Sequence, residues 1–113
     1  MKYKGVDVFK VAGPFLMGTL HIYEEVMKAV AEKPKIRIIN LEKVPFFDQS
    51  DLHLLETFYK KCQRDNIRLI LLGMRAQPFS MIKKTGLYDS FGPKNFVGNM
   101  EQAERRVLQI LSK

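Results

Sequence analysis

The chain has little of what reactive or membrane-embedded proteins usually show in their sequences. It contains one cysteine and two histidines in 113 residues. A single cysteine cannot form an intrachain disulfide, so a reducing, intracellular setting is expected. No uninterrupted apolar run approaches the ~20 residues that span a bilayer. The basic N-terminus is not followed by an apolar stretch or a small-residue cleavage site, so no signal peptide is expected.

Recognisable catalytic and cofactor motifs are missing as well. The sequence has no Gly-x-Gly-x-x-Gly, no phosphate-binding P-loop, no Gly-x-Ser-x-Gly and no metal-binding pattern of histidine and cysteine. His21 and His53 stand alone and are expected to be partly exposed polar residues of helices. Cys62 falls on the apolar side of a predicted helix, so we expect a small buried residue and not a nucleophile. The hypothesis is therefore no enzyme, no metal and no cofactor.

The composition is that of a globular protein with a basic surface. Hydrophobic residues make up 46% and charged residues 27% of the chain, and the length suits one domain over residues 1–113. The net charge of +7 predicts attraction to an anionic partner. The basic residues are scattered, however, with short clusters only at 60–61, 83–84 and 105–106. Without a basic patch interleaved with aromatics, no nucleic-acid binding is expected.

Hydrophobic periodicity predicts alternating strands and helices. The predicted strands cover residues 6–11, 15–17, 35–41, 67–72 and 96–97. The predicted helices are one that Thr19 caps and Pro34 ends, one over 52–64, a shorter one from about Pro78 to a stop at Gly86, and one over 100–111 capped by Asn99.

This order predicts an α/β fold. Strands joined by helical crossovers are parallel, whereas the first two strands are close enough in sequence to pair antiparallel at one edge. We therefore expect a mixed, mostly parallel sheet of four to five strands, with helices packed mainly on one face. The nearly continuous apolar run at 35–41 indicates a central strand.

A polar turn at residues 48–51 separates the 35–41 strand region from the next helix. Backbone N–H groups at a helix start attract anions, so this turn is where a partner or a phosphate would act. Asp48 and Asp51 could be read as paired acids, but aspartate at a helix start favours capping. Capping is the preferred interpretation, and a direct functional role is left open. Ser50 is expected to be the helix N-cap, with its phosphorylation also left open.

Five segments of the chain resemble a STAS (SpoIIaa-like) domain. They are residues 8–18, 38–41, 44–48, 67–73 and 84–87, and the resemblance extends over about residues 5–112. STAS domains occur in bacterial anti-sigma-factor antagonists and in the cytoplasmic C-terminal parts of SulP-family anion transporters. The Gly-Pro-Phe-Leu-Met-Gly run at 13–18 is similar to the SulP branch.

The resemblance implies a four- or five-stranded sheet and no catalytic activity. In the family's signature turn, Asp48 matches the acidic residue and Ser50 matches a hydroxyl residue. Gln49 stands where antagonists carry the serine that a partner kinase phosphorylates, and Asp51 replaces a glycine. The resemblance therefore implies that the kinase-controlled switch does not operate here in its usual form, because Gln49 has no hydroxyl and Asp51 repels a phosphate.

Three functional hypotheses follow. The first is a non-catalytic regulatory and interaction domain of a SulP-type anion (sulfate) transporter, cytoplasmic or at the cytoplasmic face of the inner membrane. Its partners would be the transporter membrane domain and cytoplasmic regulatory proteins, with a homodimer left open. The second is a free-standing signalling protein like an anti-sigma-factor antagonist. The third is a small protein that binds nucleotides weakly through the turns at Asp48–Leu52 and at Gly73, Met74 and Arg75.

Overall fold

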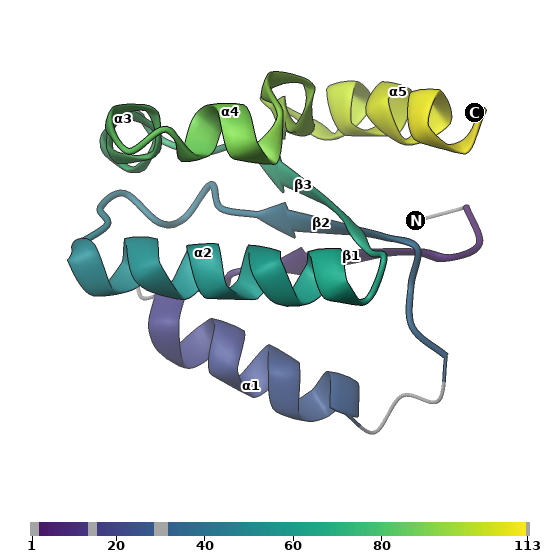
Figure 1. Cartoon of the computed structure of the whole chain (residues 1–113), viewed down its shortest axis with the longest axis horizontal. Coiled ribbons are helices and arrows are strands. Elements are labelled where there is room, and N and C mark those ends of the chain that lie inside the picture. Colours follow the sequence, from purple (N-terminus) through teal and green to yellow (C-terminus); the bar gives the residue numbers. More distant parts are fainter. Residues whose placement is uncertain (1–2, 14–15, 29–31, 113) are drawn as a thin grey trace.

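Four parallel strands form the sheet of the described chain, which covers residues 3–13, 16–28 and 32–112 of a computed structural model. Neighbouring strands pair in the order β1-β2-β3-β4, and helices connect them (Figure 1). The elements in chain order are β1 Val6–Lys10, α1 Leu16–Lys28, β2 Ile36–Asn40, α2 Gln49–Arg64, β3 Arg68–Leu72, α3 Ala76–Lys84, α4 Leu87–Phe91, the 3-10 turn η1 Pro93–Asn95, β4 Phe96–Val97 and α5 Met100–Leu111.

The predicted α/β class and its largely parallel sheet are confirmed. β2 and β3 lie at the centre, and all their residues are buried except Arg37 and Arg68. Such continuous burial explains why these two strands are the clearest in the sequence. A strand covered on both faces needs apolar residues at consecutive positions.

The strand predicted at residues 15–17 is wrong. Leu16 and Met17 belong to α1, and Phe15 lies outside the described residues. Leu16, Leu20 and Tyr23 follow the helical period, and all three are buried in the core. A three-residue apolar run fits either period, so only the packing decides it. Consequently the expected antiparallel pairing does not occur, and Thr19 lies inside α1 and not at its N-cap.

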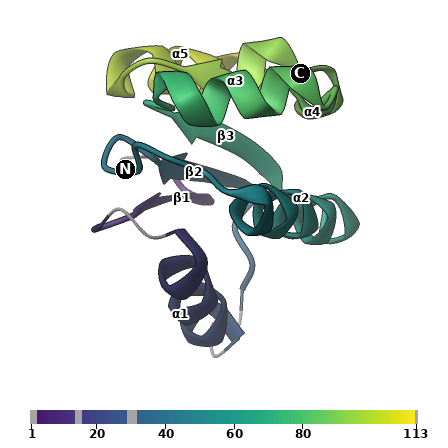
Figure 2. The ribbon, with the colours of Figure 1, turned by 90° about the vertical axis from the view of Figure 1, so that its left-hand side faces the viewer.

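Two helices cover one face of the sheet, and a third covers part of the other (Figure 2). Side chains of α1 and α2 share one large core cluster with those of β2 and β3, and Ile82 of α3 and Phe91 of α4 join it. On the opposite face, Ala103 and Val107 of α5 pack on a smaller cluster from β2 and β3. The expectation that most helices pack on one face is therefore confirmed.

The second half of the chain follows the prediction closely but contains one unexpected helix. Asn99 caps α5, since its side chain accepts a hydrogen bond from the N–H of Gln102 at 2.9 Å. Gly86 follows α3 with φ +81°, the left-handed conformation that ends helices. The short helix α4 comes directly after it and was not predicted, because five residues are too few to show a helical period.

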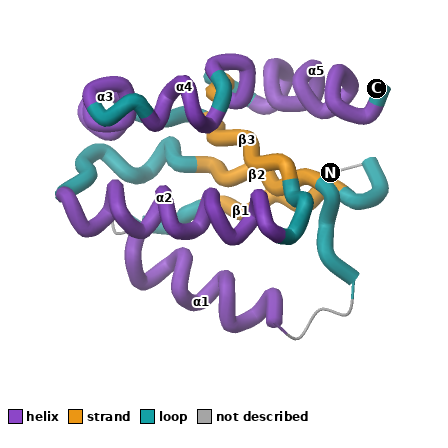
Figure 3. Tube along the Cα trace, viewed as in Figure 1, coloured by secondary structure: helices purple, strands orange, loops and turns teal. Residues whose placement is uncertain are grey.

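Parallel strands place all their carboxyl ends at the same edge of the sheet. The loop from β2 to α2 and the loop from β3 to α3 both leave from this edge, and Figure 3 shows both as loop segments on the same side. Ligand and partner sites of open parallel sheets lie at this edge. It is therefore the place to look for function.

Candidate functional site

The start of α2 is held by two aspartates that cap each other. Asp48 is the N-cap, and its Oδ1 accepts a hydrogen bond from the Asp51 N–H at 2.9 Å. Asp51 Oδ2 in turn accepts from the Asp48 N–H at 2.9 Å. This reciprocal arrangement is a capping box, so the capping interpretation of the two acids is confirmed. The expectation that Ser50 is the N-cap is wrong. Ser50 is the second residue of α2, directly after Gln49, and it is exposed.

The turn brings two carboxyl groups together at the start of α2. Burial raises the pKa of the Asp51 carboxyl, and the charge of Asp48 adds to the rise, against the hydrogen bond from the Asp48 N–H, which lowers it. The positive end of the helix dipole attracts both carboxylates. Because these two groups already occupy the helix start, a further anion there meets like charge. The turn is therefore suited to a neutral or basic partner.

A shallow hollow runs along α2 beside this turn. It has a volume of about 570 Å³ and is lined by side chains one and two helical turns apart, namely Gln49, Ser50, His53, Leu54 and Thr57. Phe46, which precedes the turn, leaves 60% of its side chain exposed. The surface next to the capping box thus combines apolar area with small polar groups. Solvent-exposed aromatic side chains of this kind are enriched at protein interfaces.

The second predicted loop starts where β3 ends. Gly73 has φ +72°, and its N–H donates to the carbonyl of Val97 at 2.8 Å. A Cβ at this position would overlap the Cγ of Glu42 and lie 3.2 Å from its Cδ. Glu42 is itself fixed by Asn40, whose Nδ2 donates to Glu42 Oε1 at 2.8 Å and whose Oδ1 accepts from the Glu42 N–H at 2.9 Å. Any other residue at position 73 would therefore have to displace the Glu42 side chain.

This loop lines a hollow of its own. The hollow has a volume of about 470 Å³, and its walls include charged, aromatic and backbone groups: Glu42, Gly73, Met74, Arg75, Phe79 and Phe96. All three residues predicted for this loop, Gly73, Met74 and Arg75, are among its walls. Asp48, Gln49, Ser50 and Asp51 are not.

One side chain ties the two loops together. Gln77 of α3 accepts a hydrogen bond from the Phe47 N–H at 2.7 Å and donates to the Phe47 carbonyl at 3.0 Å. Phe47 is fully buried and immediately precedes Asp48. The turn and the Gly73 loop therefore lie side by side at one edge of the sheet, although they line different hollows.

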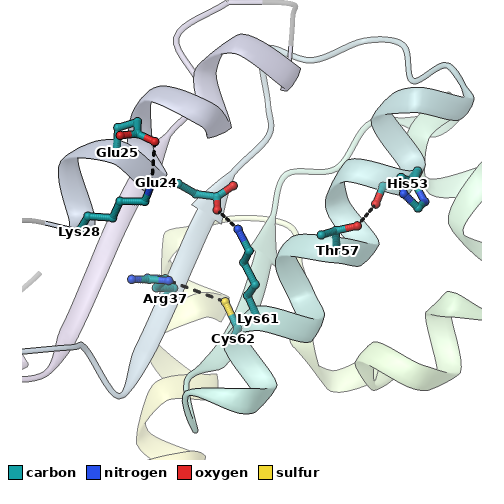
Figure 4. Close-up of polar contacts among 8 residues, drawn as sticks. All are labelled: Glu24, Glu25, Lys28, Arg37, His53, Thr57, Lys61 and Cys62. Atoms are coloured by element: carbon teal, nitrogen blue, oxygen red, sulfur yellow. Dashed lines mark hydrogen bonds and ion pairs between the residues drawn. The ribbon is translucent and has the colours of Figure 1, made fainter.

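The remaining candidate residues are one cysteine and two histidines, of which His53 lines the hollow on α2. Cys62 is 1% exposed and receives a hydrogen bond from Arg37 Nη1 at 3.9 Å (Figure 4). Burial raises the pKa of its thiol, and the nearby guanidinium opposes the rise only in part. The predicted burial of Cys62 is confirmed, and its lack of reactivity stays a prediction. His21 and His53 are exposed, and the His53 carbonyl accepts from Thr57 Oγ1 at 2.9 Å.

Two further searches were negative over the part of the chain that the structure describes. In residues 3–13, 16–28 and 32–112, no group of three or more histidine, cysteine, aspartate or glutamate side chains is arranged to hold a metal ion. Among the helices of these same ranges, none has the length and apolar character needed to cross a membrane.

The structure thus defines an α/β domain with a parallel four-stranded sheet and a capped helix start at the carboxyl edge of that sheet, and comparison with known proteins gives its family. The STAS domain model matches residues 2–104. The chain therefore belongs to the STAS domain family.

One curated relative is named as a candidate sulfate transporter. It is YvdB of Bacillus subtilis (strain 168), to which the chain is 28% identical over 98 residues. That match covers 86% of this chain but 18% of the relative, so the chain spans less than a fifth of that protein's length.

Two solved structures share the fold. One is the SulP transporter STAS domain from Vibrio cholerae, with a TM-score of 0.87, 22% identity and coverage of 100% of this chain and 89% of that one. The other is a sulfate transporter family protein from Wolinella succinogenes, with a TM-score of 0.86, 22% identity and coverage of 98% and 91%.

The sequence did not point to Gln77, Asn40 or Glu42. Gln77 forms its hydrogen bonds with a residue 30 positions earlier in the chain, so no local pattern predicts its role. Glu42 reads as an ordinary exposed acid of a loop. The one signal available was Gly73 directly after a strand, where a glycine indicates a close approach of other atoms to the backbone.

Proposed function

We propose that this STAS domain is a non-catalytic regulatory and protein-interaction domain of a SulP-type anion (sulfate) transporter. Similarity to proteins named as sulfate transporters supports the assignment, and the chain's small share of its relative's length suits one domain of a larger protein. The proposed partners are the transporter membrane domain and cytoplasmic regulatory proteins.

The surface beside the capping box is the observation that carries this proposal. Phe46 is a large exposed aromatic side chain two residues before the N-cap of α2, and the hollow on the first turns of α2 adds the half-buried Leu54. Two carboxylates, those of Asp48 and Asp51, border this area. An apolar centre bordered by charge is the usual composition of a docking surface, with the aromatic residue as its anchor.

The basic character of the chain supports a location at the cytoplasmic face of the inner membrane. The net charge is +7. An anionic leaflet attracts basic residues near its surface by ~1 kcal/mol for each favourably placed lysine or arginine. In this proposal the domain is cytoplasmic and is drawn toward the membrane that holds the rest of the transporter.

A transport assay tests the proposal. The full reading frame that encodes the chain is expressed in a strain without its own sulfate uptake, as wild type, Phe46→Glu and Leu108→Glu. Phe46→Glu should change sulfate uptake several-fold at an unchanged membrane level of the protein, because a charge at the anchor prevents docking. Leu108, 48% exposed on α5, is the matched control and should leave uptake unchanged.

Equal uptake by all three proteins would contradict a regulatory role of this surface. A reading frame without hydrophobic spans would contradict the transporter assignment itself. The two failures are therefore separable.

A free-standing signalling protein similar to anti-sigma-factor antagonists is the second candidate. Ser50 favours it, because this hydroxyl is exposed in the first turn of α2. Gln49 and Asp51 oppose it, since one lacks a hydroxyl and the other repels an added phosphate. Incubation with an anti-sigma kinase, followed by mass spectrometry, should show unmodified protein and no complex. Phosphate on Ser50 would instead support this candidate.

Nucleotide binding is the third candidate, and the hollow at the Gly73 loop favours it. Arg75 supplies charge there and Phe79 and Phe96 supply aromatic surface for a base. Titration with GTP or ATP, followed by backbone amide shifts, tests it at Gly73–Arg75. Sedimentation of the same samples gives the mass in solution and so tests the homodimer.

A further inference from the structure

A polar notch lies at the opposite edge of the sheet, where β3 begins. It has a volume of about 340 Å³ and is formed by the second half of α2, the start of β3 and η1. Its polar side chains come from these three elements and from the turn between α2 and β3: Tyr59, Gln63, Asn66, Arg68 and Asn95. Nothing in the proposed docking role uses this notch.

Two arginines from different elements lie at this notch: Arg68 lines it, and Arg106 contacts Asn95, which lines it. Arg68 is exposed at the first position of β3, and Arg106 is half-buried on α5. Arg106 Nε donates to Asn95 Oδ1 at 2.8 Å, and Arg106 Nη1 donates to Gln109 Oε1 at 3.1 Å. Asn95, which lines the notch, therefore holds the second guanidinium at its border.

These two guanidinium groups have no acidic counterpart in the described structure. Within residues 3–13, 16–28 and 32–112, the ion pairs involve other basic residues and neither Arg68 nor Arg106. Asp65, on the turn that leads to the notch, pairs with Lys33 at 3.0 Å. Among the described residues, the guanidinium groups of Arg68 and Arg106 are thus left without an acidic partner.

The end of α2 does not neutralise it either. The carbonyls of Lys61, Cys62 and Gln63 accept hydrogen bonds from the N–H groups of residues 65–67 at 2.8–3.2 Å. Burial lowers the pKa of the Arg106 guanidinium, and the charge of Arg68 lowers it further. An anion that bridges two like charges held close together lowers their electrostatic repulsion.

We infer that the notch binds a small tetrahedral oxyanion such as sulfate or phosphate. Arg68 and Arg106 are the charged donors, and Asn95 positions Arg106 through its Nε. A guanidinium donates two parallel hydrogen bonds to an oxyanion, and two guanidiniums at an angle can engage different oxygens of a tetrahedral group. The site lies at the amino edge of the strands, so it stands independently of the docking surface at the carboxyl edge.

Amide chemical shifts test this inference. The protein is titrated with sodium sulfate, sodium phosphate and, at equal ionic strength, sodium chloride. Sulfate or phosphate should produce saturable shifts at Asn66, Arg68, Asn95 and Arg106, and chloride should not. The separate sulfate and phosphate titrations show which oxyanion the site prefers.

Three variants identify the donors. Arg68→Gln and Arg106→Gln should each weaken binding by about tenfold or more, because each removes charge-assisted hydrogen bonds. Arg105→Gln removes the same charge from the same helix and should leave binding unchanged. Its side chain is 65% exposed and pairs with Glu101 instead.

Arg68→Lys keeps the charge at an exposed position that packing does not constrain, and so remains informative if Arg106→Gln fails to fold. It should bind less tightly than wild type and more tightly than Arg68→Gln. Equal shifts with chloride, equal weakening by Arg105→Gln, or saturable shifts confined to other residues would each overturn the inference.

Discussion

Replacing Gly73 by alanine tests how the carboxyl edge of the sheet is built. The residue has φ +72°, and an added Cβ would overlap the side chain of Glu42. Alanine in the left-handed region costs roughly 1–2 kcal/mol. To make room, Glu42 must swing away and lose its 2.8 Å part-buried hydrogen bond from Asn40, which is worth about 1 kcal/mol. The free energy of unfolding should therefore fall by about 2–3 kcal/mol.

Urea unfolding followed by far-ultraviolet circular dichroism measures this change, since the chain contains no tryptophan to report it by fluorescence. The melting temperature should fall by roughly 10 °C. Gly86→Ala is the matched control: it has φ +81° but no atom within 4 Å of the added Cβ. It should cost only the backbone contribution of roughly 1–2 kcal/mol.

A double-mutant cycle separates the overlap from the backbone strain. Glu42→Ala removes both the overlapping Cγ and the hydrogen bond, so Gly73→Ala in that background should cost only the backbone contribution. The two substitutions should therefore be coupled by about 1 kcal/mol. Strictly additive costs, or a Gly73→Ala that costs no more than Gly86→Ala, would refute the close packing of Glu42 on Gly73.

Three further predictions concern pH, loop anchoring and thiol chemistry. The pKa of Asp51 is raised in the folded protein, so the stability it contributes is present at low pH and is lost as the pH rises through that pKa. Asp51→Asn keeps an acceptor for the Asp48 N–H, and its unfolding free energy relative to wild type should improve as the pH rises through the raised pKa of the Asp51 carboxyl; a constant difference in pH-dependent urea unfolding would contradict this. Gln77→Ala breaks both hydrogen bonds to Phe47 and should lower the unfolding free energy by about 1–3 kcal/mol and speed hydrogen exchange at the Phe47 amide, whereas unchanged exchange would show that the two loops are not tied. Cys62 should react with a thiol reagent only as fast as the protein unfolds, because it is 1% exposed, and labelling that is insensitive to denaturant would disprove its burial.

The sequence was informative where one local rule decides the structure. β2 and β3 are nearly continuous apolar runs, and a run of this kind predicts a central strand. Asp48 and Asn99 precede helices, where their short acceptor side chains bond N–H groups that the helix leaves unpaired. That the chain lacks known catalytic and metal-binding motifs can likewise be seen from its residue types and their spacing alone.

Prediction from sequence was wrong where two local rules compete. The apolar run at 15–17 suits a strand as well as a helix, and the contacts of Leu16 with the core favoured the helix. Ser50 and Asp48 are both good N-caps, and the helix began after Asp48, because Asp51 could then complete the capping box. Neither choice depends on the short segment alone.

By itself, the sequence determined the α/β class, the parallel central strands and the capped turn at residues 48–51, because periodicity and capping act within a few residues. Only the tertiary structure decided which loops share an edge, that Gln77 joins them, and that Arg68 and Arg106 border one notch. These arrangements bring together residues 30 or more positions apart, as in the bond from Phe47 to Gln77. Such distant partners are chosen by the packing of the whole sheet and its helices, which no local pattern records.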